Sequence, residues 1–143
     1  MFTKILSTLT IFFLIISFQT KNQIIGEWKL ASYDAIDKIR ETPAYIFGDE
    51  AAKEMIEKQF SLMLNDGKYV FTAKTLNYTD IEKGNIVTRT ALWKLDNNTL
   101  TIQETERNYK REAFIKKITS DSLILVPVID GIVGDSKMTF IRE

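Results

Sequence analysis

The chain has 143 residues, which suits one domain, and its 45% hydrophobic and 27% charged content is that of an ordinary globular protein. Lysine plus arginine and aspartate plus glutamate number 19 each, so no net field favours nucleic acid or an anionic membrane. The sequence contains no cysteine and no histidine, which excludes disulfides, thiolate nucleophiles, histidine-based triads and cysteine or histidine metal sites. We therefore expect no nucleic-acid partner, no cofactor and no metal site, with oxygen-only calcium or magnesium sites as the remaining alternative.

Residues 1–23 are interpreted as a targeting segment that is separate from the fold. Lys4 supplies a positive charge, and Ile5 to Phe18 form an apolar run that matches a signal-peptide core but falls short of the ~20 residues of a membrane span. We expect cleavage near Gln19, giving an exported protein, periplasmic or secreted, with no stable membrane insertion and one domain over residues 24–143. The alternative is an uncleaved N-terminal anchor.

The first predicted strand covers residues 25–34 and is rich in apolar, β-branched and aromatic residues. Gly26 indicates a bend in this strand, and Trp28, two positions later, points to the same face of the sheet. Residues 34–47 contain Pro43 and are interpreted as a connection with an edge strand at residues 44–47.

Residues 48–59 have the 3.6-residue spacing of an amphipathic helix. Asp49 is a suitable N-cap, and the apolar stripe of this helix includes Met55 and Ile56. The opposite face is charged, so we expect this helix to lie on another part of the protein.

From residue 60 onward the sequence predicts short strands joined by tight turns. Asp66-Gly67 is typical of a tight hairpin, and the asparagines at positions 97 and 98 tolerate left-handed backbone. Residues 77–84 and 129–136 are interpreted as loops. The predicted strands are residues 60–64, 69–75, 86–95, 100–106, 112–118, 123–128 and 137–142.

Together with the first strand, these segments give about eight strands in meander order, with no crossover helices among them. Closing such a sheet removes both exposed edges. We therefore predict an all-β fold, an antiparallel up-and-down eight-stranded β-barrel with one short helix between the first two strands. Its interior has room for side chains or one small ligand. Alternation along the strands predicts the following inward-facing residues: Trp28, Leu30, Tyr69, Phe71, Ala73, Ala91, Trp93, Leu95, Leu100 and Ile102.

Short motifs in this sequence resemble those of the lipocalin superfamily. Gly26-Glu27-Trp28 resembles the Gly-x-Trp signature, and Arg142 resembles the basic residue that packs over this tryptophan at the closed end of lipocalin barrels. The Asp-Gly turn and the strand that contains Trp93 are similar to those of short lipocalin-like domains of exported bacterial proteins. The resemblance covers most of residues 24–142 and implies structural roles for Gly26, Trp28 and Arg142.

The sequence departs from larger secreted lipocalins because it lacks disulfides and a helix after the barrel. Its helix lies between the first two strands, which is similar to the helical lid of fatty-acid-binding proteins. A barrel that admits a ligand needs a mobile element at one rim, and elements that gate sites tend to be the less stable ones. Because this helix interrupts the strand order and has a narrow apolar stripe, we expect Met55 and Ile56 to cover the open end of the barrel. The alternative is that the helix packs on the outer wall against residues 123–128.

We predict that the protein binds a small apolar molecule inside the barrel, in contact with Met55, Ile56, Tyr69, Phe71 and Trp93. The alternative is a non-enzymatic accessory or protein-interaction module with a filled barrel and an unknown protein partner. An enzyme is not expected, because the sequence lacks a nucleophile–base set.

A cluster of charged residues lies at the end of the strand predicted at residues 100–106. Glu104 and Glu106 lie two positions apart on a predicted strand, with Arg107 and Arg111 nearby. Paired carboxylates serve acid–base chemistry when one of them is desolvated. We interpret this set instead as a solvated outer face or a charged sheet edge.

Overall fold

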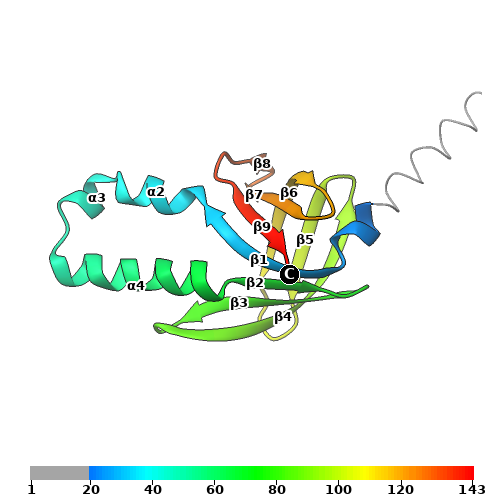
Figure 1. Cartoon of the computed structure of the whole chain (residues 1–143), viewed down its shortest axis with the longest axis horizontal. Helices are drawn as coiled ribbons and strands as arrows, with labels where there is room; N and C mark the ends of the chain where they lie inside the picture. Colours follow the sequence, from blue (N-terminus) through cyan, green and yellow to red (C-terminus); the bar gives the residue numbers. More distant parts are fainter. Residues whose placement is uncertain (1–19) are drawn as a thin grey trace, which may run out of the picture.

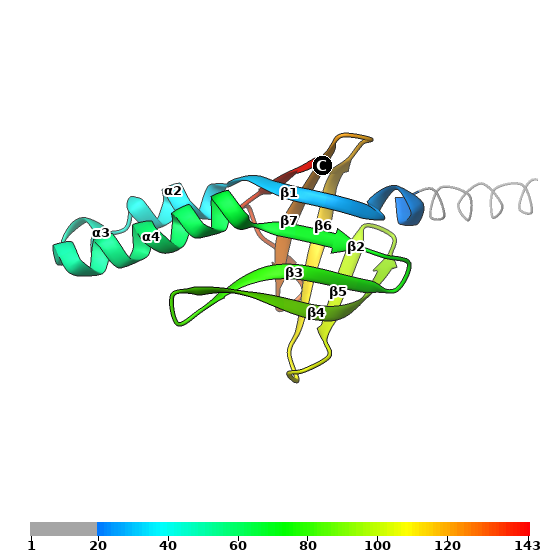
Figure 2. The ribbon, with the colours of Figure 1, turned by 60° about the horizontal axis from the view of Figure 1, so that its bottom comes forward.

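The computed structural model describes residues 20–143, and eight of their strands close into an antiparallel β-barrel (Figures 1 and 2). Each barrel strand pairs with its neighbours, and β9 closes the ring by pairing with both β1 and β7. A short strand, β8 (Ile132–Val133), extends β7 outside the ring. The predicted fold class is confirmed. The barrel strands in order are β1 (Gly26–Tyr33), β2 (Lys68–Phe71), β3 (Thr75–Glu82), β4 (Asn85–Asp96), β5 (Thr99–Glu104), β6 (Lys110–Ile118), β7 (Ser122–Ile129) and β9 (Met138–Arg142).

The barrel core follows from alternation of side chains along the strands. In β5, for example, Leu100, Ile102 and Glu104 are buried while the residues between them are partly exposed. Of the ten residues predicted to face inward, Ala73 is exposed and Leu95 is partly buried, whereas the others are buried. Ala73 is exposed because β2 ends at Phe71, so the strand alternation does not extend to it.

One end of the barrel is closed by contacts between the first and last strands. The guanidinium of Arg142 lies 4.1 Å from the ring centroid of Trp28, so the predicted cation–π contact is present. Arg142 also donates to the carbonyl oxygens of Gln23 and Ile25, at 2.6 and 3.0 Å. Gly26 has φ = +134°, and a Cβ atom at this position would collide with the Arg142 guanidinium. The glycine is therefore required where the first strand meets the arginine.

Three helices connect β1 to β2 and project from the other end of the barrel: α2 (Asp34–Arg40), α3 (Pro43–Ile46) and α4 (Glu50–Asp66). A short helical segment at residues 20–24 lies at the closed end instead. Arg40 of α2 joins Glu57 of α4 through an ion pair of 2.7 Å, and Tyr45 donates to the same carboxylate at 2.6 Å. These bonds hold the three helices together as one arm.

The predicted helix at residues 48–59 is present, and Asp49 caps it by accepting from the Ala52 backbone N–H at 2.8 Å. It continues to Asp66, so the predicted strand at residues 60–64 and its hairpin turn were wrong. Phe60, Met63 and Leu64 extend the apolar stripe at helical spacing, which favours helix over strand. The Asp66-Gly67 pair therefore ends a helix.

Two further predictions were wrong. The connection predicted at residues 34–47 is helical and has no edge strand at residues 44–47, because Pro43 occupies the first turn of α3, where its missing N–H costs nothing. The loop predicted at residues 77–84 belongs largely to β3, in which Leu76 and Tyr78 face inward between polar neighbours. One predicted strand is thus lost and one is gained, which leaves the count of eight unchanged.

Among residues 20–143, none of the helices has the length and apolar character that a membrane span requires. The targeting segment predicted at residues 1–23 lies almost wholly outside the described residues, since the structure describes only its last four positions.

Candidate functional site

The candidate site lies at the open end of the barrel, opposite Trp28 and Arg142. Three pockets at this end, with volumes of about 400, 440 and 210 Å³, share a single lining residue, Arg111 of β6. Tyr69 of β2 lines the first and third of these pockets, and Tyr78 of β3 lines the second and third. Arg111 is therefore the residue that lines all three pockets at the barrel mouth.

Alternation along β6 places Arg111 on the inner face of the barrel. Ala113 and Ile115, two and four residues later, pack in or against the core. A terminal nitrogen of Arg111 donates to the Tyr69 hydroxyl at 3.2 Å. The guanidinium lies 4.4 Å from the ring centroid of Tyr78 and 5.9 Å from that of Tyr69. Two tyrosine rings therefore surround this charge.

The Nε atom of Arg111 is buried and has no hydrogen-bond partner among the described residues. Its guanidinium also forms no ion pair within the part of the chain that the structure describes. Buried charges in proteins are ordinarily paired with an opposite charge or fully hydrogen-bonded. Arg111 is thus a partly buried cation whose buried Nε–H is free to donate.

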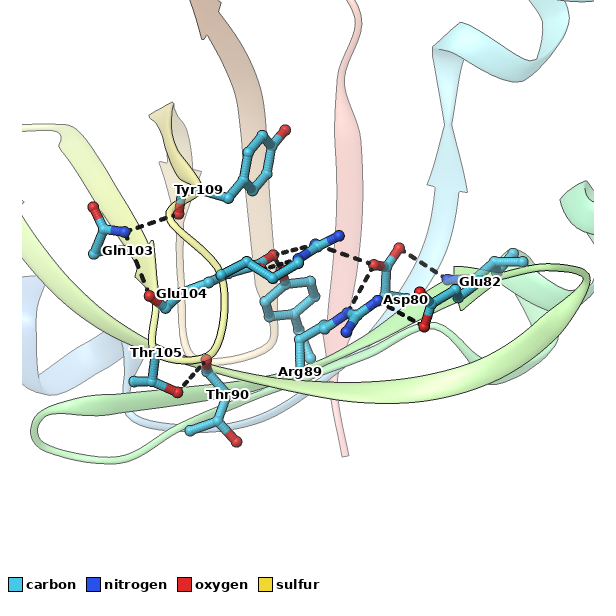
Figure 3. Close-up of polar contacts among 11 residues, drawn as sticks. Asp80, Glu82, Arg89, Thr90, Gln103, Glu104, Thr105 and Tyr109 are labelled. Atoms are coloured by element: carbon cyan, nitrogen blue, oxygen red, sulfur yellow. Dashed lines mark hydrogen bonds and ion pairs between the residues drawn. The ribbon is translucent and has the colours of Figure 1, made fainter.

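A separate polar network joins charged side chains of β3, β4 and β5 (Figure 3), and its Glu104 lines one of the pockets that Arg111 also lines. Glu104 of β5 is only 5% exposed and accepts from Arg107 Nε at 2.5 Å and from the Tyr78 hydroxyl. The bond from Arg107 holds the pKa of Glu104 down at about 2, against the effect of burial. Burial, together with the bond to Glu104, raises the pKa of Tyr78. Glu104 is therefore an ionised carboxylate that is already occupied.

The same network uses the neighbouring carboxylates of β3. Arg89 of β4 pairs with Asp80 at 3.2 Å and with Glu82 at 3.1 Å, and Figure 3 shows it between them. Arg107 also approaches Asp80, at 3.6 Å. Two arginines thus engage the three acidic groups, and none of these groups is left to neutralise Arg111.

This network corrects the interpretation of Glu104 as part of a solvated outer face. Glu104 points into the barrel mouth, whereas Glu106 is exposed beyond the end of β5. The two side chains do not share a face, because the strand and its alternation stop at Glu104. Acid–base work by this pair is not supported, since Glu104 stays charged and paired.

The pocket of about 400 Å³, here called the apolar pocket, lies between β5, β6, β7 and β9. Its volume falls within the about 300–1,000 Å³ typical of small-molecule sites. Deeply buried Ile102 and Leu125 line it, whereas Tyr109 and Ile129 at its rim are exposed. Its other lining residues are Tyr69, Lys110, Arg111, Glu112, Ala113, Pro127, Val128, Asp130 and Met138.

The residues predicted to touch a ligand lie in three different places. Tyr69 lines the apolar pocket, but Phe71 and Trp93 are buried in the core, with ring centroids 5.5 Å apart. Met55 is 66% exposed on α4 and lines a separate pocket between this helix and the β3–β4 hairpin. Ile56 is partly buried on α4 and lines none of the pockets that share Arg111. The structure therefore brings only Tyr69 to the apolar pocket.

Sequence reasoning missed Arg111 and Tyr78 as residues of the barrel mouth. The signal for Arg111 was its alternation with Ala113 and Ile115, which marks a cation on an apolar strand face. Tyr78 was missed because its segment was interpreted as a loop. Among residues 20–143, no cluster of three or more acidic groups could hold a metal ion.

A family profile and one solved structure agree with this barrel architecture. The profile of the lipocalin-like domain family matches residues 24–125, which is more than half of the chain. A lipocalin-like protein from Bacteroides uniformis has a similar structure, with a TM-score of 0.51 and 16% sequence identity over 85% of this chain and 99% of its own. An uncharacterized protein from Bacteroides eggerthii has a TM-score of 0.48 and 14% identity, covering 83% of this chain and 98% of its own. No curated protein matches the sequence. The chain belongs to the family of lipocalin-like domains.

Proposed function

We propose that this protein is an exported, non-enzymatic binding protein that holds a small, largely apolar molecule in the open end of its barrel. The observation that carries the proposal is the apolar pocket of about 400 Å³, which is closed below by Ile102 and Leu125 and opens to solvent between Tyr109 and Ile129. A concave, mostly apolar site with a few converging polar groups is the usual form of a small-molecule site.

The two halves of the barrel support a division of roles. The closed half is filled by Trp28, Phe71 and Trp93, all of which are buried. None of these three side chains lines the pockets that share Arg111, which supports placing a ligand at the mouth. Of the predicted ligand contacts, Tyr69 belongs to the binding surface in this proposal, and Phe71 and Trp93 support it from below.

Export rests on the apolar run that follows Lys4, which precedes the described residues. The contacts at the closed end support cleavage before Gln23, because the carbonyl oxygens of Gln23 and Ile25 bind Arg142 and Ile24 is fully buried. We therefore propose a mature N-terminus between Gln19 and Asn22. N-terminal sequencing of the protein from producing cells tests this, and an intact Met1 in the membrane fraction would indicate an anchor.

A pocket-filling substitution tests the binding proposal. Ala113 lines the apolar pocket, so Ala113→Phe should place a ring in the space that a ligand needs. We expect the affinity for a fluorescent apolar dye, and for the fatty acids and alcohols that displace it, to fall at least tenfold. Overpacking of this kind costs about 1–3 kcal/mol of stability, so melting is measured alongside binding.

The matched control is Ala51→Phe, which adds the same ring at an exposed position of α4. It should leave both dye binding and melting close to those of the unsubstituted protein. Equal dye affinity in the Ala113 variant and the unsubstituted protein would show that the dye binds elsewhere and would contradict the proposal.

The tip of the helical arm supports a second candidate function, docking to another protein. Phe47 is 85% exposed at this tip, and Ile46 beside it is 51% exposed. Exposed apolar side chains that cluster on a projection are typical of interaction surfaces. Failure of every dye and amphiphile to bind the barrel would favour this accessory role over ligand binding.

A further inference from the structure

We propose that Arg111 binds the carboxylate of an amphipathic anion whose apolar tail lies in the apolar pocket. This inference rests on the proposed function and names the class of ligand. Two observations carry it: Arg111 is a partly buried cation with a buried, unpaired Nε–H and no counter-charge, and the same residue lines the apolar pocket.

The guanidinium of Arg111 has no counter-charge among the described residues. Burying a guanidinium without an acidic partner is costly, and side chains of this kind are retained where a ligand or partner completes them. The acidic groups Asp80, Glu82 and Glu104 are engaged by Arg89 and Arg107. Glu112 and Asp130 line the apolar pocket, but neither forms an ion pair with Arg111. A ligand anion would supply the missing charge.

Arg111 and Tyr69 offer hydrogen-bond donors that suit a carboxylate. The free Nε–H of Arg111 and a terminal N–H of the same guanidinium form a fork that matches the two oxygens of a carboxylate. Tyr69 accepts from Arg111 at 3.2 Å and keeps its own hydroxyl proton to donate. A carboxylate at this point would therefore receive bonds from the arginine and from Tyr69, and it would satisfy the orphaned Nε–H.

The apolar tail of the proposed ligand would lie in the apolar pocket. The Nε atom is buried, so a bound head group lies inside the mouth and the tail extends along Leu125 and Pro127 toward the rim. There Ile129 is 69% exposed and Ile132, its partner across the β7–β8 hairpin, is 72% exposed. A tail of sufficient length would cover these side chains. A neutral ligand would leave the arginine unpaired, and a cation would be repelled by it.

Calorimetric titration of the purified protein with decanoate, 1-decanol and decyltrimethylammonium compares three head groups on one tail. We expect decanoate to bind 10–100-fold more tightly than decanol, as a charge-assisted bond to a buried group predicts (about 1.5–3 kcal/mol). The ammonium compound should bind most weakly. Across octanoate, decanoate and dodecanoate, each buried methylene should raise the affinity about fourfold.

Arg111→Gln is the variant that tests the residue, and Arg89→Gln is its matched control, because Arg89 lines none of the three pockets that share Arg111. We expect Arg111→Gln to abolish the preference for decanoate over decanol while it keeps the affinity for decanol. Arg89→Gln should keep the preference. Arg111→Gln should also melt no lower than the unsubstituted protein without ligand, since it removes an unpaired buried charge.

Each contrary result has a distinct meaning. Equal binding of decanoate and decanol by the unsubstituted protein would overturn this inference and leave the proposed function standing. A carboxylate preference that survives Arg111→Gln would overturn the assignment to Arg111. Absence of binding by all the amphiphiles and by the dye would refute the proposed function itself.

Discussion

Glu104 and Arg111 line the same pocket at the barrel mouth, but Glu104 has a partner of opposite charge and Arg111 has none among the described residues. The carboxylate of Glu104 is buried and receives bonds from Arg107 and Tyr78. Arg111 is partly buried, with one bond to Tyr69 and a free, buried Nε–H. We infer that Glu104 stabilises the mouth of the folded protein, whereas Arg111 lowers its stability.

The low pKa of Glu104 predicts a specific dependence of stability on pH. Its pKa is about 2 in the folded protein, because of the Arg107 bond, against an ordinary value near 4.5. The stabilisation is thus fully present above about pH 4.5 and is lost as the pH falls toward 2. We expect Glu104→Gln to cost about 1–3 kcal/mol at pH 7, and this gap should shrink below pH 4.5.

Thermal melts of the unsubstituted protein and the Glu104→Gln variant between pH 7 and pH 2.5 measure this gap. The control is Glu106→Gln, which replaces an exposed glutamate next to the same strand and should melt normally throughout. A gap for Glu104→Gln that stays constant down to pH 2.5 would show that the carboxylate is not held ionised by the fold.

Single residues were predictable from the sequence where one local rule applied. Gly26, Trp28 and Arg142 were identified because a glycine and an aromatic residue two positions apart share a strand face, and because the motif resembles lipocalins. Arg111 was not identified, since its meaning depends on which acidic groups of other strands are already occupied. That pairing is a property of tertiary structure and leaves no mark in the sequence of β6.

At the scale of elements, α4 shows why the helix was underestimated. Its first half has a narrow apolar stripe, and its second half carries Phe60, Met63 and Leu64, which also suit a strand. The second half packs against the barrel core through Met63 and Leu64, whereas Met55 in the first half only lines a pocket beside the β3–β4 hairpin. An Asp-Gly pair can end either a strand or a helix, so this pair does not distinguish the two. The spacing of apolar residues over several turns is the signal that distinguishes them.

The position of α4 leads to a prediction about Met55 and Ile56. Neither residue lines the pockets that share Arg111, so we expect the double variant Met55→Glu, Ile56→Lys to bind decanoate within about twofold of the unsubstituted protein. Its melting temperature should fall slightly, because Ile56 is partly buried. Titration and melting of this one variant, beside the exposed-site control Ala51→Phe, provide the measurement. Weaker binding with unchanged melting would instead show that α4 covers the open end.

At the scale of the whole molecule, the fold class was predictable because meander order and edge protection both favour a closed barrel. The predicted number of strands was correct although residues 60–64 and 77–84 were assigned wrongly. Closure of a barrel depends on the number of strands, and the two errors left that number at eight. The hollow at the mouth was not predictable. It depends on how far the large side chains of the closed half fill the interior.

Closure predicts that the barrel does not tolerate loss of its last strand. Deleting residues 137–143 removes β9 and exposes the edges of both β1 and β7. We expect the truncated protein to aggregate or to lose cooperative melting, which size-exclusion chromatography and calorimetry would detect. Replacing Ile141, an exposed residue of β9, by threonine is a mild control that should leave the protein monomeric. A truncated protein that stays monomeric and melts normally would contradict the closed barrel.

The bonds from Arg142 to Gln23 and Ile25 bear on when the barrel can close during synthesis. These contacts join residues 117 and 119 positions apart, so they form only after nearly the whole domain has been synthesised. Until β9 is available, β1 has a free edge, and the carbonyl groups that seal the floor have no donor. The floor of the barrel is therefore completed by the last strand to be synthesised, and the closed end cannot form without it.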